Sequence, residues 1–225
     1  MSAAATPPLV CANRLIAIGA STGGPAAIEY LLKQLDQKTV PIVIAQHMPG
    51  IFTRAFARRL DETNTMSVKE AQSGDALYFG RVLIAPGGLQ MAVRKSAGGF
   101  IAEVSDTPPV NRHKPSVDYL FESVVAAAPP AALGILLTGM GNDGAQGLLA
   151  MHCAGYATLA QNEATSAVWG MPREAVKLGA VDESGILTLE EIAVAMRNFA
   201  VQKDDKPVAS RGHAIFFRLR DWLYI

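Results

Sequence analysis

The 225-residue sequence lacks an excess of charge of either sign. It has 20 lysines and arginines against 20 aspartates and glutamates, which gives a formal net charge of zero, and it contains no long basic or acidic block. A protein that binds nucleic acid usually carries a basic patch facing the phosphates. We therefore predict that nucleic acid is not a partner.

Cysteine is also scarce. Cys11 and Cys153 are the only two, and they are far apart and form no C-x-x-C pair. Such usage is typical of free thiols in a reducing compartment rather than of a disulfide framework. The sequence also has no H-E-x-x-H pattern and no cysteine cluster that would ligate zinc. We therefore expect no metal and no cofactor.

Long apolar runs are missing as well. No stretch approaches the roughly 20 apolar residues that span a membrane. Residues 1–8 contain no basic segment ahead of an apolar one, so no signal peptide is expected. Half of the residues are nevertheless apolar, which is enough to form one sizeable core. The prediction is a cytoplasmic protein without membrane insertion.

Among the features present, an apolar run that ends in a glycine-rich turn stands out. Residues 15–18 are apolar and lead into Gly19-Ala20-Ser21-Thr22-Gly23-Gly24-Pro25. Such a run suits a strand buried on both faces of a parallel sheet, and the glycines and proline suit a tight turn into a helix. Residues 19–23 also match the G-x-S-x-G pattern of an exposed nucleophilic serine. A plain turn with a solvated serine explains these five residues equally well.

The order of strand, turn and helix recurs along the chain and predicts a parallel α/β sheet. Helices are expected over 24–35, 51–62, 116–128, 172–178 and 188–199. Strands are expected over 40–45, 68–70, 81–85, 90–94, 100–104, 132–137 and 156–160.

The predicted fold class is therefore α/β, with a doubly wound, mainly parallel, Rossmann-like three-layer sheet. The runs 90–94 and 100–104 flank a glycine pair and predict an antiparallel β-hairpin. We place the domain at residues 13–199, after a flexible N-terminal tail at 1–12. A C-terminal tail of unassigned role follows at 200–225.

Three polar residues follow three of the apolar strands. They are Ser21, His47 and Asp143, and functional groups gather beyond the carboxyl ends of strands in open α/β sheets. A serine becomes nucleophilic when an imidazole takes its proton and a carboxylate holds that imidazole in one tautomer. These three residues are therefore a candidate catalytic triad. Two plainer interpretations stay open: a turn histidine bonded to backbone at 47, and an ordinary helix N-cap at 143.

Two other site types compete with the triad. Residues 139–144 fit the dinucleotide-binding pattern G-x-G-x-x-G, and Glu163 stands about 20 residues further on. Against this, the carboxylate of Asp143 would repel a pyrophosphate, and the fingerprint usually belongs to the first βαβ unit. The serine turn also suggests an α/β-hydrolase, whose triad order is serine, acid, histidine. His47 instead gives the order serine, histidine, acid.

The chain resembles the catalytic domain of the chemotaxis protein-glutamate methylesterases, the CheB type. The matching stretches follow in family order across residues 14 to about 198, and they are 18–24, 46–49, 85–88, 109–118, 137–144, 160–164 and 170–175. The resemblance implies a triad of Ser21, His47 and Asp143. It also places Thr22 and the backbone of Met140 close to the reacting carbonyl, where their amides stabilise the oxyanion.

The function that the resemblance implies is that of a serine hydrolase. Its substrate is a γ-glutamyl methyl ester on the cytoplasmic domain of a methyl-accepting chemotaxis receptor, and its products are glutamate and methanol. This reaction serves chemotaxis adaptation. Some family members also act as protein-glutamine glutaminases on receptors. The alternatives are a nucleotide-binding Rossmann-type protein and a non-catalytic module that binds receptors.

The sequence departs from the family pattern in two ways. The family typically carries a phosphorylatable receiver domain ahead of the catalytic one, but only about a dozen residues precede the first predicted strand here. We therefore expect no receiver domain and no phosphorelay control within this chain. The position that is often histidine is Gln90 here. The matched segment 109–118 has two interpretations: it shapes the substrate cleft, or it is a structural loop with Ser116 as an N-cap.

Overall fold

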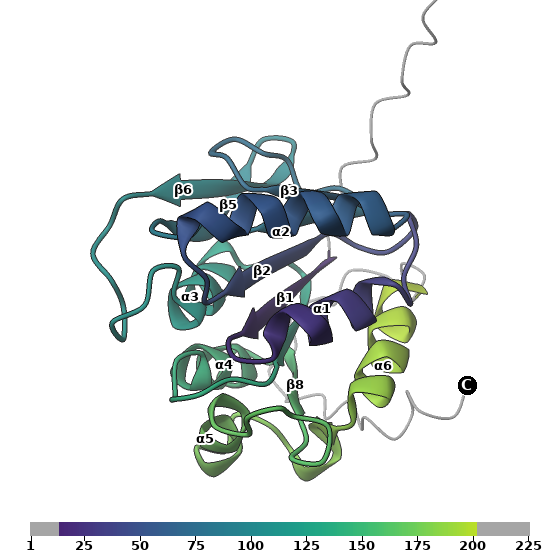
Figure 1. The fold of residues 1–225 in the computed structure, drawn as a ribbon, viewed down its shortest axis with the longest axis vertical. Coiled ribbons are helices and arrows are strands. Elements are labelled where there is room, and N and C mark those ends of the chain that lie inside the picture. Colours follow the sequence, from purple (N-terminus) through teal and green to yellow (C-terminus); the bar gives the residue numbers. More distant parts are fainter. Residues whose placement is uncertain (1–13, 202–225) are drawn as a thin grey trace, which may run out of the picture.

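The computed structural model describes residues 14–201, in which strands and helices alternate (Figure 1). The strands are β1 (Arg14–Ala20), β2 (Ile42–Gln46), β3 (Ser67–Glu70), β4 (Arg81–Ile84), β5 (Gln90–Ser96), β6 (Gly99–Ser105), β7 (Ala131–Leu136), β8 (Ala157–Gln161) and β9 (Ile186–Leu187). The helices are α1 (Gly24–Leu32), α2 (Gly50–Thr63), α3 (Val117–Ala127), α4 (Ala145–Cys153), α5 (Met171–Lys177) and α6 (Leu189–Val201), with a short 3₁₀ turn, η1 (Glu183–Gly185).

The tail predicted at 1–12, and nearly all of the tail predicted at 200–225, lie outside the described residues, as does Cys11. Cys153 is a free, exposed thiol. Within residues 14–201, no helix is long and apolar enough to cross a membrane.

Seven strands form one parallel sheet in the order β3-β4-β2-β1-β7-β8-β9. Strands β5 and β6 pair separately as an antiparallel hairpin. The predicted fold class, a mainly parallel sheet with an added hairpin, is confirmed. The short strand β9 and the turn η1 were not expected, because three or fewer residues carry no readable periodicity.

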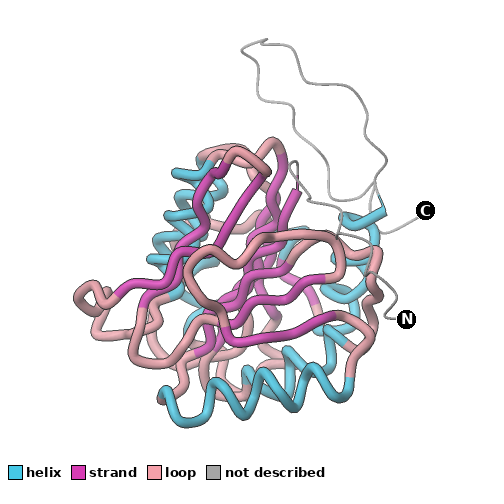
Figure 2. Tube along the Cα trace, turned by 90° about the horizontal axis from the view of Figure 1, so that it is seen from above, coloured by secondary structure: helices cyan, strands magenta, loops and turns pink. Residues whose placement is uncertain are grey.

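The sheet separates two apolar cores, and Figure 2 shows its strands between helices. Helices α1, α2 and α6 cover one face, and helices α3, α4 and α5 cover the other together with the hairpin. Successive residues of β1 enter opposite cores: Ile16 and Ile18 face the first, and Leu15 and Ala17 face the second. All four are fully buried. A strand with helices on both faces must be apolar at every position, which explains the uninterrupted apolar runs.

The topology brings the carboxyl ends of three strands together at the centre of the sheet. Strand β1 lies between β2 and β7, so the strand order reverses beside it. Figure 1 shows the arrowheads of β1 and β2 side by side. In the register, Ala20 pairs with Gln46, and Gly19 pairs with Leu136. The residues that follow these pairs therefore emerge at the switch point where open α/β sheets form their sites.

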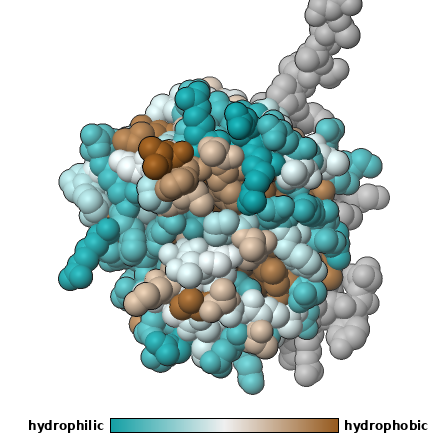
Figure 3. Space-filling model, viewed as in Figure 1, coloured by the Kyte–Doolittle hydropathy of each residue, from teal (hydrophilic) through white to brown (hydrophobic). Residues whose placement is uncertain are grey.

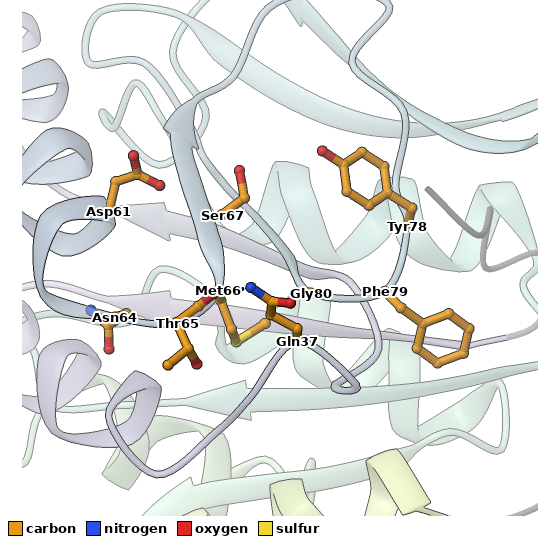
Figure 4. A pocket seen from close by; sticks show the side chains of 9 residues that line it. All are labelled: Gln37, Asp61, Asn64, Thr65, Met66, Ser67, Tyr78, Phe79 and Gly80. Atoms are coloured by element: carbon orange, nitrogen blue, oxygen red, sulfur yellow. Dashed lines mark hydrogen bonds between the residues drawn. The ribbon is translucent and has the colours of Figure 1, made fainter. Parts of the chain in front are cut away.

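A hollow of about 440 Å³ lies at the opposite edge of the sheet, near the start of β3 and β4 (Figure 4). Two of its polar side chains are hydrogen-bonded to backbone groups. The Asp61 carboxylate accepts a hydrogen bond from the Val68 N–H (2.8 Å), and the Gln37 amide donates to the Thr65 carbonyl (3.1 Å). These residues stabilise loops at this edge, away from the switch point.

Candidate active site

Ser21 occupies the turn between β1 and α1. Gly23 is the N-cap of α1 with φ 83°, a left-handed conformation that favours glycine. The Ser21 N–H donates to the Thr138 carbonyl (3.0 Å), and the Gln46 side-chain amide donates to the Ser21 carbonyl (2.9 Å). The turn is thus tied to the ends of both neighbouring strands. Its serine is partly exposed.

The second glycine-rich turn packs directly on the first. A Cβ atom at Gly139 would lie 2.7 Å from the Ser21 Cβ, so only glycine allows this approach. The Thr138 hydroxyl donates to the Thr22 carbonyl (2.9 Å). Within residues 14–201, neither the Thr22 amide nor the Met140 amide donates a hydrogen bond. Two main-chain donors beside Ser21 are therefore free to bind an anion.

Asp143 is fully buried and accepts hydrogen bonds on both carboxylate oxygens. Its Oδ2 accepts from His47 Nε2–H and from the Val117 N–H, both at 2.7 Å. Its Oδ1 accepts from the Ser116 hydroxyl (2.7 Å) and the Asn111 amide (3.0 Å). Burial by itself would raise the pKa of Asp143, but these hydrogen bonds outweigh it and lower the pKa from 3.8 to about 2. The carboxylate is ionised at neutral pH.

The N-cap interpretation of Asp143 is wrong. Gly144, with φ 91°, is the N-cap of α4, and no side chain within residues 14–201 caps that helix. The Asp143 carboxylate lies instead at the N-terminus of α3, where Ser116 is the N-cap and accepts from the Tyr119 N–H (3.3 Å). The positive end of the α3 dipole therefore favours the ionised carboxylate.

His47 presents its two ring nitrogens to different surroundings. Nε2–H points at Asp143, whereas Nδ1 is buried and has no hydrogen-bond partner in the described part of the chain. The interpretation of a turn histidine with its ring bonded to backbone is therefore wrong. The main-chain N–H of His47 donates to the Ala20 carbonyl (3.0 Å). His47 and Ser21 thus follow paired residues on strands about 4.8 Å apart, although no hydrogen bond joins their side chains among the described residues.

The segment 108–116 supplies contacts that the sequence left open. Asn111 and Ser116 both donate to Asp143, and Ser116 also caps α3 as expected. The His113 ring stacks on the His47 ring, with centroids 3.8 Å apart and planes inclined by 6°. These residues stand in a matched stretch of the sequence, but their spacing alone does not show which atoms they contact. The segment is both a structural loop and one wall of the site.

A second buried carboxylate, Asp118, lies beside the first. The Asn111 amide donates to Asp118 Oδ2 as well as to Asp143 Oδ1, and the Gly147 N–H donates to Asp118 Oδ1 (2.6 Å). Burial raises the pKa of Asp118, the Gly147 hydrogen bond lowers it, and the charge of Asp143 raises it further, to about 6 overall. Two neighbouring carboxyl groups therefore titrate in very different pH ranges.

An apolar groove of about 330 Å³ borders the site on the side of α2. It is lined by Pro25, Met48, Phe52 and neighbouring α2 residues. Phe52 is 54% exposed and Ile51 is 80% exposed. Figure 3 shows apolar side chains gathered over the first half of α2. Because Met48 directly follows His47, this apolar surface lies next to the polar groups.

The glycine pattern at 139–144 has a packing explanation. A Cβ atom at Gly144 would lie 2.6 Å from Val117 Cγ1, so the last glycine permits contact with α3. Asp143 in the same turn faces His47, while Glu163 is exposed on a loop. The turn therefore needs no dinucleotide to account for its glycines. No group of three or more histidine, cysteine, aspartate or glutamate side chains in the described chain could hold a metal ion.

Comparison with known proteins shows extensive sequence similarity. The CheB methylesterase family model matches residues 16–196. A protein-glutamate methylesterase/protein-glutamine glutaminase from Hahella chejuensis is 50% identical over 193 residues, which cover 86% of this chain and 53% of the relative. The Salmonella typhimurium protein of that name is 49% identical over 189 residues, covering 84% of this chain and 54% of the relative. The chain spans about half the length of these curated relatives.

A solved structure shows similarity of the fold. The crystal structure of the Thermotoga maritima CheB methylesterase catalytic domain matches this chain with a TM-score of 0.77 at 30% sequence identity. The match covers 83% of this chain and 98% of the Thermotoga chain. The described domain therefore corresponds to nearly the whole of that catalytic domain.

Proposed function

The chain belongs to the CheB methylesterase family, and from this premise we propose that it hydrolyses γ-glutamyl methyl esters of methyl-accepting chemotaxis receptors. The products are a glutamate side chain and methanol. The names of the relatives also include protein-glutamine glutaminase, so the proposal extends to deamidation of receptor glutamines, which have the same acyl group. The proposed partner is the cytoplasmic domain of the receptor, and the proposed location is the cytoplasm.

One observation carries the proposal: His47 is hydrogen-bonded to Asp143 through Nε2, while its buried Nδ1 has no partner among residues 14–201. An ionised aspartate only accepts hydrogen bonds, so it holds the proton on Nε2 and leaves a lone pair on Nδ1. This nitrogen is the base in the proposed mechanism. It takes the Ser21 hydroxyl proton as Oγ attacks the ester carbonyl, and Asp143 stabilises the imidazolium that forms.

The attack places negative charge on the carbonyl oxygen. The free amides of Thr22 and Met140 flank Ser21 and are the proposed donors to this oxyanion. One such donor lowers the barrier by about 3 kcal/mol in related sites. Both donors are main-chain groups, so the side chain of Met140, which is 73% exposed, has no part in this step.

The intermediate then collapses and the ester C–O bond breaks. The His47 imidazolium gives its proton to the leaving methoxide, and methanol departs from an acyl-Ser21 ester. Water next attacks this ester while His47 Nδ1 takes a proton. The proton returns to Ser21 Oγ as glutamate is released. With a glutamine substrate the first leaving group is ammonia, and the later steps are the same.

The open surroundings of Ser21 suit an ester carried on another protein. The serine is partly exposed, and the apolar groove beside it includes Phe52 and Met48. A flexible glutamyl ester on a receptor helix needs this access, because the helix itself cannot enter a deep pocket. Apolar side chains that flank the ester on the receptor would contact the groove.

The test is methanol release from methylated receptor membranes. We expect Ser21→Ala to lower the rate by at least about 10⁴-fold. Ser96→Ala, on the exposed end of the hairpin, is the matched control and should keep full activity. A Ser21→Ala variant as active as the wild type would refute the serine mechanism. Receptor binding by a wild type that releases no methanol would instead favour a non-catalytic binding module, and nicotinamide-cofactor binding that Gly141→Val abolishes would favour a nucleotide-binding protein.

A further inference from the structure

The His113 ring covers one face of His47 and has no task in the mechanism above. Its centroid lies 3.8 Å from that of His47, and the rings are nearly parallel. Both nitrogens of His47 are accounted for without it, since Nε2 binds Asp143 and Nδ1 is the base. A stacked ring restricts rotation of its neighbour, because tilting either plane would force the atoms into contact.

The main chain holds His113 in this position. Its N–H donates to the Val110 carbonyl (2.8 Å), and its own carbonyl accepts from the Val110 N–H (3.1 Å). Between them, Asn111 and Arg112 have φ values of 50° and 66°, which are uncommon for residues other than glycine. Such a backbone persists only where the surrounding contacts determine it. The ring is therefore held by a fixed turn.

Gln90 fastens both ends of the segment that carries this turn. It is fully buried, and its amide donates to the carbonyls of His113 (3.2 Å) and Pro108 (3.4 Å). Its Oε1 accepts from the Ser116 N–H (2.8 Å). An amide is donor and acceptor at every pH. These three hydrogen bonds, which we call the Gln90 clamp, therefore hold the segment 108–116 at any pH.

Burial and the neighbouring His47 both disfavour a proton on the His113 ring. Burial lowers the pKa of His113, the positive charge of His47 lowers it further, and Asp143 has the opposite, smaller effect. Of the two cations adjacent in the chain, Lys114 forms an ion pair with Asp106, and Arg112 is exposed. A positive charge on His47 therefore disfavours a second one on His113. A neutral ring can lie against the imidazolium, whereas a second positive ring would be repelled.

We propose that His113 is a positioning residue for ester hydrolysis: its ring, held by the Gln90 clamp, fixes the plane of His47 so that Nε2 stays on Asp143 and Nδ1 faces Ser21. This inference rests on the proposed function. It concerns neither proton transfer nor substrate binding by His113 itself, so a flat aromatic side chain without nitrogens should serve in its place.

Replacement by alanine and by phenylalanine separates stacking from other roles. We expect His113→Ala to lower kcat by about 10- to 100-fold with KM changed by less than about twofold. His113→Phe should restore kcat to within about threefold of the wild type. His152→Ala, whose ring contacts Thr158 on another part of the chain, is the matched control. Wild-type kcat in His113→Ala, or a His113→Phe variant no better than His113→Ala, would overturn the inference.

A measurement without substrate distinguishes this inference from the proposed function. In protein with ¹⁵N-labelled histidine, NMR reports which nitrogen of His47 carries the proton. We expect the Nε2–H tautomer in the wild type and in His113→Phe, and a mixture of tautomers in His113→Ala. The His113 titration step should disappear in both variants. A His47 spectrum unchanged by His113→Ala would overturn the inference even if methanol release is confirmed, while absence of methanol release from the wild type would refute only the function.

Discussion

The two glycine-rich turns of the site end in cap glycines of nearly the same backbone conformation, but one site residue is partly exposed and the other is buried. Gly23 caps α1 with φ 83° and ψ −12°, and Gly144 caps α4 with φ 91° and ψ −15°. Each turn follows a strand of the central sheet. Yet Ser21 in the first turn is partly exposed, whereas Asp143 in the second is fully buried. The local conformation therefore does not decide which role a turn plays.

The difference comes from what packs on each turn. The N-terminus of α3 and the segment 108–116 cover Asp143 and supply its donors, among them Ser116 and Val117. Around Ser21 the neighbouring side chains of Met140 and Phe52 are largely exposed. A hydrolase acting on a protein substrate needs both conditions. Its acid must be held rigidly, and its nucleophile must be reachable.

The largest expected effects are on catalysis, where the two turns should behave as one unit. Ser21→Ala and Asp143→Asn should each lower kcat for methanol release by about 10⁴-fold or more, because an asparagine does not hold the His47 tautomer. The double variant should lose no more than the worse single variant. Losses that multiply in the double variant would show that the two turns act independently.

Substitutions at Asp143 and at Ser21 should differ in their effect on the free energy of unfolding. Asp143→Ala leaves the buried Ser116 hydroxyl and Val117 N–H without their acceptor, so we expect the free energy of unfolding to fall by about 3–5 kcal/mol. Ser21→Ala removes an atom that makes no described side-chain hydrogen bond and should change it by less than about 0.5 kcal/mol. Urea denaturation measures both. Equal midpoints would mean that the Asp143 contacts contribute nothing to folding.

The shared backbone can be tested at the cap glycines. A Cβ atom would lie 2.6 Å from Ala167 Cβ at Gly23 and 2.6 Å from Val117 Cγ1 at Gly144. Alanine at either position combines the strain of a left-handed backbone with overpacking. It should lower the free energy of unfolding by roughly 2–4 kcal/mol. Gly155 is the control, because it has φ 84° with nothing within 4 Å of its Cβ position. Gly155→Ala should lower the free energy of unfolding by only about 1–2 kcal/mol. An equally large decrease at Gly155 and Gly144 would show that overpacking contributes nothing at Gly144.

A last expected effect concerns pH and Asp118, the second carboxylate behind the buried turn. The pKa of Asp118 is about 6 in the folded protein against an ordinary 3.8, so the folded state binds this proton more tightly. The ionised Asp118 carboxylate destabilises the folded protein above pH 6. This destabilisation is lost as the pH falls from 6 toward 3.8. Relative to Asp118→Asn, the wild type should gain up to about 3 kcal/mol in unfolding free energy between pH 7 and pH 4.

Urea denaturation at intervals across this range measures the gain. Asp143 is present in both proteins, so the pH dependence that it contributes near its ordinary pKa of 3.8 cancels in the comparison. A difference between wild type and Asp118→Asn that does not change with pH would show that Asp118 is not destabilised by burial beside Asp143.

The sequence by itself determined the fold class and the positions from which the site is built. Uninterrupted apolar runs such as residues 15–18 require a strand covered on both faces, and polar residues directly after such strands must emerge at one edge of a parallel sheet. Ser21, His47 and Asp143 could be singled out in this way. The resemblance added Thr22 and Met140, whose amides are free in the structure.

Only the tertiary structure decided how these groups are held. It places Asp143 at the N-terminus of α3 rather than α4, stacks His113 on His47, and uses Gln90 to fasten the segment between them. Each contact joins residues 23 or more positions apart, across elements whose packing angle no local pattern encodes. Periodicity reports which face of an element is buried, but the atom that a buried polar group meets depends on the element packed against it.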